Sequence, residues 1–79
     1  MPYDRRILGY TIRTLRQKKG LSQEALSGLA VVSRSQLAAI ESGCSNPHID
    51  TLWRVSEVLG IKLSELIKLV ENEDGKEPP

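Results

Sequence analysis

Residues 23–43, QEALSGLAVVSRSQLAAIESG, hold the strongest structural signals in the chain. They predict two short helices joined by a tight turn. Each helix is preceded by a serine, Ser22 or Ser33, whose hydroxyl can accept a hydrogen bond from a free amide of the first turn. Gln36 stands three residues after Ser33 and completes a capping box. Gly43 can adopt a positive φ angle and end the second helix.

Each of these two helices carries a short apolar stripe. The stripes are Ala25, Leu26, Leu29 and Ala30 in the first helix, and Leu37 and Ile40 in the second. Helices of this length are not stable alone in water, so both must pack against other elements. The second helix begins with residues 33–36, Ser-Arg-Ser-Gln. Four hydrogen-bonding side chains at a helix N-terminus suit entry into the major groove of DNA.

The flanking sequence predicts three further helices and no strands. The expected ranges are Asp4, as N-cap, to about Lys19; about Ile49 to Leu59, with Leu52, Val55, Ser56 and Leu59 facing inward; and Glu65 to about Glu71, with Ser64 as cap. Gly9 weakens the first of these helices by ~1 kcal/mol relative to alanine, and it can allow a close helix contact. We therefore expect an all-α domain of five helices over residues 1–71, followed by a disordered tail over residues 72–79.

Further residues in and around the central stretch stand at a characteristic spacing. They are Arg16, Gly20, Leu21, Gln23, Leu26, Ile40-Glu41-Ser42-Gly43, Asn46-Pro47, Leu52 and Leu59-Gly60-Ile61. With these marks, residues 15–66 resemble the helix-turn-helix family of phage-type repressors, the Cro/repressor or Xre class. The resemblance implies a compact lambda-repressor-like fold in which the second and third helices form the helix-turn-helix.

Two positions depart from the pattern of that family. The turn usually holds a glycine where this chain has Val31. A β-branched residue disfavours positive φ, so the turn either uses another conformation or carries strain. A residue that is often basic in relatives is Cys44 here, so one phosphate contact is expected to be missing.

The second helix of the motif supplies the candidates for reading bases. They are Arg34, Ser35, Gln36, Ala38 and Ala39. Arg34 can bond both O6 and N7 of guanine, or it can bind a phosphate instead. Gln36 can read adenine or only hold the capping box. Ala38 and Ala39 can touch a thymine methyl group or simply let the helix approach closely.

A second group of polar residues is expected to contact phosphate. It consists of Gln23, Ser33, Ser42, Ser45 and Asn46. Gln23 opens a helix whose free N–H groups also attract anions, and the resemblance assigns this role to the family's glutamine. The resemblance also implies that Arg16 in the first helix pairs with Glu41 at the end of the third. Such a pair would fix the orientation of the recognition helix.

The distribution of charge agrees with a nucleic-acid partner, although the net charge is only +1. Residues 1–40 carry seven basic side chains against two acidic ones, whereas residues 41–79 carry four against eight. The first part is therefore suited to meet phosphate and the second to avoid it. Two solvated faces of unequal charge are the alternative explanation.

The sequence offers little for catalysis. The single cysteine, Cys44, and the single histidine, His48, lie in one predicted loop and supply too few ligands for zinc. We interpret them as a loop thiol beside a loop imidazole, and we expect no enzyme activity, metal, cofactor or small-molecule substrate. No apolar run approaches the ~20 residues of a membrane span, so a cytoplasmic protein that avoids membranes is expected.

The C-terminal region holds more apolar residues than one short helix needs to cover a core. We expect a homodimer interface formed by Trp53, Leu63, Ile67 and Val70. The alternative is that Trp53 only roofs the core. A two-fold dimer would place two recognition helices on paired half-sites of DNA.

The hypothesis that follows is a transcriptional regulator that binds double-stranded DNA sequence-specifically, as a homodimer on a pseudo-palindromic operator. Chains of this length and pattern resemble the controller proteins of restriction–modification systems, small phage repressors and some antitoxins. The alternative hypothesis is an antitoxin or protein-binding adaptor, in which the helix-turn-helix is a scaffold and the acidic tail over residues 72–79 binds the partner.

Overall fold

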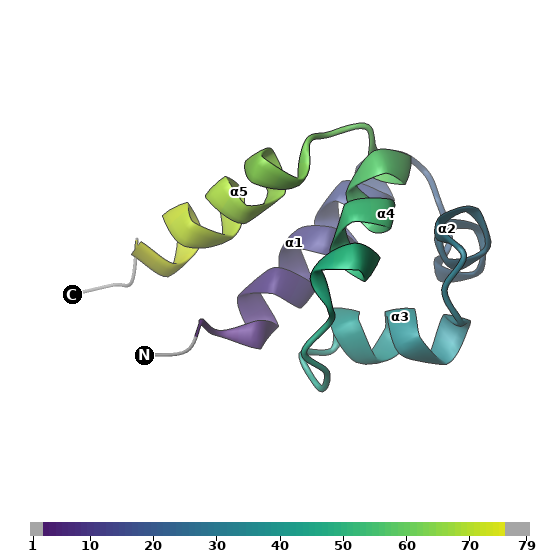
Figure 1. Ribbon diagram of the computed structural model, residues 1–79, viewed down its shortest axis with the longest axis horizontal. Helices are drawn as coiled ribbons and strands as arrows, with labels where there is room; N and C mark the ends of the chain where they lie inside the picture. The colour runs from purple at the N-terminus through teal and green to yellow at the C-terminus, as the bar shows by residue number, and fades with distance from the viewer. Residues whose placement is uncertain (1–2, 76–79) are drawn as a thin grey trace.

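The computed structural model describes the backbone of residues 3–75 and the side chains of residues 3–72. Within residues 3–75 there are five helices and no strand, which confirms the all-α prediction. The helices are α1 (Arg5–Lys18), α2 (Gln23–Ala30), α3 (Arg34–Glu41), α4 (Ile49–Leu59) and α5 (Leu63–Gly75). None of these described helices is long and apolar enough to cross a membrane. Figure 1 shows α3 along the lower edge of the molecule, with α2 and α5 toward opposite ends.

All five helices contribute to one apolar core. Its buried members are Leu8, Ile12, Leu26, Ala30, Leu37, Ile40, Leu52, Val55, Leu59, Leu66 and Val70. The inward stripe predicted for α4 is buried. The stripe predicted for α2 was wrong at Leu29, whose side chain is 64% exposed. At 100° per residue, Leu29 lies about 100° around α2 from the centre of the buried face formed by Leu26, Ser27 and Ala30.

The N-termini of the first three helices are capped as predicted. Asp4, Ser22 and Ser33 each accept a hydrogen bond from a backbone N–H of the helix that follows, at 2.9, 3.0 and 3.0 Å. His48 precedes α4 without a capping bond from its side chain, which agrees with its expected weakness as a cap.

The predicted bounds of the last helix were wrong at both ends. The Lys62 carbonyl accepts the N–H groups of Glu65 and Leu66, so α5 begins at Leu63 and Ser64 lies inside it. The helix also continues to Gly75, into the segment expected to be disordered, because extending a packed helix adds one hydrogen bond per residue. Residues 76–79 of the expected tail lie outside the described residues.

The first four helices end in one backbone motif, the Schellman motif. In each motif a backbone N–H donates to the carbonyl oxygen five residues earlier, with N–O distances of 2.9–3.1 Å. The pairs are Leu21 to Arg16, Val32 to Ser27, Cys44 to Ala39 and Ile61 to Ser56. Three of the four left-handed positions in these motifs are glycines, whereas the motif after α2 has Val31 with φ 57° and ψ 49°. The turn thus keeps the conformation that suits glycine, and Val31 carries the strain.

Gly9 is the point where α1 lies closest to α3. A side chain there would place its Cβ atom 2.8 Å from the Glu41 carbonyl carbon and closer still to the carbonyl oxygens of Ile40 and Glu41. The close helix contact expected from the sequence is therefore present. This contact sets the distance between α3 and the rest of the domain.

Candidate nucleic-acid interface

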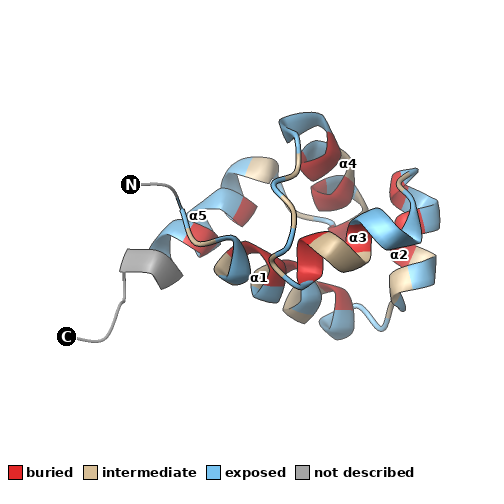
Figure 2. Ribbon diagram, turned by 90° about the horizontal axis from the view of Figure 1, so that it is seen from below, coloured by how far each residue is buried: buried red, intermediate tan, exposed pale blue. Residues whose placement is uncertain are grey.

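The N-terminal half of α3 is the exposed part of that helix, and Figure 2 looks onto this side of the molecule. Arg34, Ser35 and Gln36 are exposed, whereas Ala38 and Ala39 in the next turn are half-buried. Only the first half of the capping box is present in the described part of the chain. Ser33 Oγ accepts the Gln36 N–H at 3.0 Å, and the Gln36 amide does not return the bond, so it stays available to a ligand.

A buried ion pair holds the other end of α3. Arg16 donates from Nε to Glu41 Oε2 at 2.7 Å and from Nη2 to Oε1 at 2.9 Å. Its third contact is a hydrogen bond of 2.8 Å to the Leu21 carbonyl oxygen. Donation of these hydrogen bonds to the Glu41 carboxylate raises the pKa of the Arg16 guanidinium above its ordinary value. This two-pronged pair ties α1 to the end of α3, in the arrangement that the resemblance implied.

Gln23 joins the same network. Its Nε2 donates to Glu41 Oε1 at 3.0 Å, so the Glu41 carboxylate joins the end of α1, the start of α2 and the end of α3. A primary amide has two N–H groups, and one of them remains for a phosphate. Gln23 also lines a groove with Arg13, Ala38 and Ser42. No local signal marks Arg13 as a site residue, because only the packing of α1 against α3 brings it to this groove.

The remaining residues expected to contact phosphate differ in whether their hydrogen-bond donors are already used within the protein. Ser33 Oγ accepts a backbone bond and keeps its own hydrogen for donation. The Ser42 hydroxyl already donates to the Ala39 carbonyl at 3.1 Å, so it must rotate to bind phosphate. Ser45 is half-buried. Asn46 is exposed, and its Oδ1 accepts the Tyr3 hydroxyl, which leaves its N–H groups for an anion.

The turn before α3 has an anchor that the sequence did not reveal. Arg54 in α4 donates from Nη1 to the carbonyl oxygen of Val31 at 2.9 Å, and it forms a 3.3 Å ion pair with Asp50. Arg54 lies 23 residues from the turn in sequence, and only the packing of α4 beside α2 brings it there.

The four residues expected at a dimer interface separate into two groups. Trp53 is 57% exposed and Ile67 is 37% exposed, while Leu63 is half-buried against the core. These three line a groove between α4 and α5. Val70 is only 6% exposed, and it belongs to the core because it follows Leu66 by one helical turn. Trp53 is too exposed to serve mainly as a cover of the core.

The loop after α3 holds no group of metal ligands. Cys44 and His48 are both exposed, and across the described residues no three His, Cys, Asp or Glu side chains converge on one point.

Known sequences resemble this chain across its helix-turn-helix. Residues 12–66 match the helix-turn-helix family HTH_3. The uncharacterized HTH-type transcriptional regulator y4dJ from Sinorhizobium fredii is 33% identical over 63 residues, which are 80% of this chain and 82% of that relative. The chain spans between 35% and 60% of the length of seven further curated relatives.

Two solved structures are similar in both sequence and fold. The restriction-modification controller protein C.AhdI from Aeromonas hydrophila has a TM-score of 0.78 and 35% identity, over 80% of this chain and 96% of that chain. The master regulator for biofilm formation SinR, solved in complex with DNA, has a TM-score of 0.73 and 36% identity, over 76% of this chain and 97% of that chain.

Proposed function

The chain belongs to the helix-turn-helix family of transcriptional regulators, and from this premise we propose that it binds double-stranded DNA with α3 in the major groove. The observation that carries the proposal is the network of Arg16, Glu41 and Gln23 at the end of α3. This network fixes the helix from inside while the opposite end of the same helix presents exposed polar side chains.

In this proposal the residues of α3 have separate tasks. Arg34 reads a guanine through its fork of N–H groups, and Gln36 reads an adjacent base with its available amide. Ser35 adds a hydrogen bond, while Ala38 and Ala39 allow close approach or touch a thymine methyl group. Phosphates contact the rim formed by Gln23, Ser33, Ser42, Ser45 and Asn46, with Arg13 as an additional donor.

We also propose that two copies of the chain pair through the groove between α4 and α5. Trp53, Leu63 and Ile67 form its apolar part, and Glu57, Lys62 and Glu71 line the same groove. In an isologous interface the same groove of each copy faces the other across the two-fold axis. Lys62 of one copy can therefore pair with a glutamate, Glu57 or Glu71, of the other. Burial of Trp53 then adds an aromatic anchor of the kind that dominates interfaces.

The dimer would bind a pseudo-palindromic operator and regulate transcription by occupying a promoter. We expect this protein to act in the cytoplasm. The similarity to C.AhdI, which extends over 96% of that controller protein, supports a role in controlling a restriction–modification operon.

The experiment that tests this function is selection from a random duplex library at near-physiological salt. Enrichment of a pseudo-palindrome with half-sites about one helical turn apart is expected. The Arg34→Ala variant should lose enrichment at one position of each half-site and keep a nearly unchanged salt dependence. If no sequence is enriched and binding vanishes steeply with salt, only non-specific phosphate attraction remains and the proposed function is wrong.

A further inference from the structure

A hydrogen bond joins the start of the described chain to the loop after the recognition helix. The Tyr3 hydroxyl donates to Asn46 Oδ1, across 43 residues of sequence. The first turn of α1 also packs tightly on the end of α3, because a Cβ atom at Gly43 would lie 2.9 Å from Arg6 Cγ. The N-terminal turn is therefore fixed beside the proposed DNA surface.

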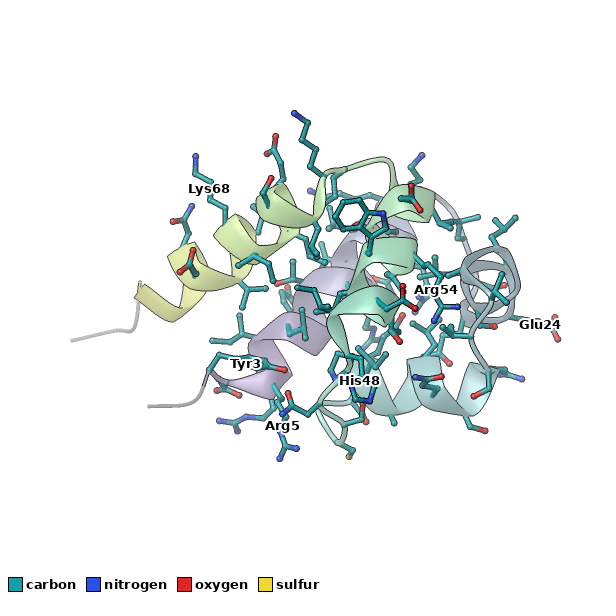
Figure 3. All side chains as sticks on the ribbon, in the orientation of Figure 1. Tyr3, Arg5, Glu24, His48, Arg54 and Lys68 are labelled. Atoms are coloured by element: carbon teal, nitrogen blue, oxygen red, sulfur yellow. The ribbon has the colours of Figure 1, made fainter. Side chains whose placement is uncertain are left out.

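A hollow lies between this turn and the loop. It is lined by Tyr3, Asp4, Arg5, Arg6, Gly43 and Asn46. Figure 3 shows Arg5 projecting toward the lower edge of the molecule, where α3 lies, while Lys68 projects from the opposite side. Arg5, which lines the hollow, thus projects on the same side of the molecule as α3.

The charge of this hollow is positive once its internal pairs are matched. The one carboxylate among its lining residues, Asp4, accepts Nε and Nη2 of Arg6 at 3.2 and 3.1 Å, as well as the Arg6 backbone N–H at 2.9 Å. These bonds lower the pKa of Asp4 and keep it ionised against Arg6. The exposed guanidinium of Arg5 then supplies the surplus positive charge, and the Asn46 amide supplies neutral donors.

We propose that this hollow is a second DNA contact, in which Arg5 and the Asn46 amide bind a backbone phosphate that flanks the base pairs read by α3. Tyr3 is the positioning residue, because its hydrogen bond orients Asn46 and holds the turn that carries Arg5. The inference rests on the proposed function and adds a sequence-independent contact to it. Its signature is a change in salt dependence without a change in the preferred sequence.

The test compares full-length variants on the duplex that the wild-type protein selects. Arg5→Gln should weaken binding about three- to tenfold and reduce the slope of log affinity against log salt by about 0.9, the value for one lost phosphate contact. Tyr3→Phe keeps the aromatic ring and should produce a smaller loss in the same direction. Lys68→Gln removes one positive charge from the opposite side and should leave affinity and slope unchanged.

Three outcomes would overturn the inference without touching the proposed function. An Arg5→Gln variant with wild-type affinity and slope would place Arg5 outside the interface, although the proposed function would stand. A changed sequence preference in that variant would assign Arg5 to base reading. An equal loss in Lys68→Gln would show only a long-range effect of net charge. Failure of the wild-type protein to bind any duplex would instead reject the proposed function, and this inference with it.

Discussion

The guanidinium of Arg54 in α4 donates a hydrogen bond of 2.9 Å to the carbonyl oxygen of Val31 in the turn between α2 and α3. Val31 is the one described residue other than glycine with a positive φ angle. The bond therefore reaches the most strained peptide of the helix-turn-helix and connects it to a helix outside the motif. Arg54 holds the start of α3, as Arg16 holds its end.

Replacing Arg54 with alanine should loosen the turn that leads into α3. We expect a loss of about 1 kcal/mol in the free energy of unfolding, the usual net value of one hydrogen bond. Operator affinity should also fall, because α3 becomes less well oriented. Denaturant unfolding and DNA binding measure the two effects. The control is Asp50→Ala, which removes only an exposed ion pair and should have a smaller effect on both.

Replacing Val31 with glycine should stabilise the protein. A left-handed conformation costs an L-residue about 1–2 kcal/mol, and part of this gain is offset by the greater freedom of glycine in the unfolded chain. Val31 is 74% exposed, so little apolar burial is lost. We expect a net gain of about 0.5–1 kcal/mol in thermal or denaturant unfolding. Val32→Gly, at the half-buried next position, should destabilise. Destabilisation by Val31→Gly would contradict the left-handed turn.

Two glycines in helices should respond to alanine in opposite ways. Alanine favours a helix over glycine by about 1 kcal/mol, so Gly28→Ala, where nothing lies within 4 Å of the new Cβ atom, should stabilise. Gly9→Ala would press against backbone carbonyls of α3 and should destabilise by about 1–3 kcal/mol. It should also weaken DNA binding by displacing α3. Equal effects of the two variants in unfolding experiments would exclude the close approach of α1 to α3.

The Arg16–Glu41 pair should behave as a matched unit. Removing one partner leaves a buried charge unpaired and should cost about 3–5 kcal/mol, against a total stability of about 4–12 kcal/mol for a chain of this length. The double variant Arg16→Met/Glu41→Leu should be more stable than either single variant, as measured by chemical denaturation. DNA binding of the folded double variant should remain weak, because Gln23 and α3 lose their shared anchor. Additive losses would argue against the pairing.

The dimer proposal predicts that a charge at Ile67 separates the two copies. Ile67→Glu should give a folded monomer with weak operator binding, which analytical ultracentrifugation and circular dichroism can measure together. Lys68→Glu adds an acid at the adjacent exposed position and should remain dimeric. Val70→Glu should unfold, because Val70 lies in the core. An unfolded Ile67→Glu protein would place Ile67 in the core as well.

Local signals in the sequence predicted most of the helices correctly. The caps at Asp4, Ser22 and Ser33 and the glycine stops at the ends of three helices are properties of short segments. Where a prediction depended on which way a helix faces, it was less reliable. Leu29 and Val70 are both apolar, yet one is exposed and the other is in the core. Their places follow from how the helices rotate when they pack.

The set of helices and the polar start of α3 follow from local sequence, because capping and periodicity act over a few residues. The partner of Arg16 came from the family pattern. The surroundings of those elements come from the packing of the helices. They are the Arg54 anchor at Val31, Gln23 as the third member of the Arg16–Glu41 network, the groove beside Trp53 and the hollow lined by Tyr3. Each of these joins residues that are distant in the chain. Such contacts form only when the common core sets the distances and rotations of whole helices.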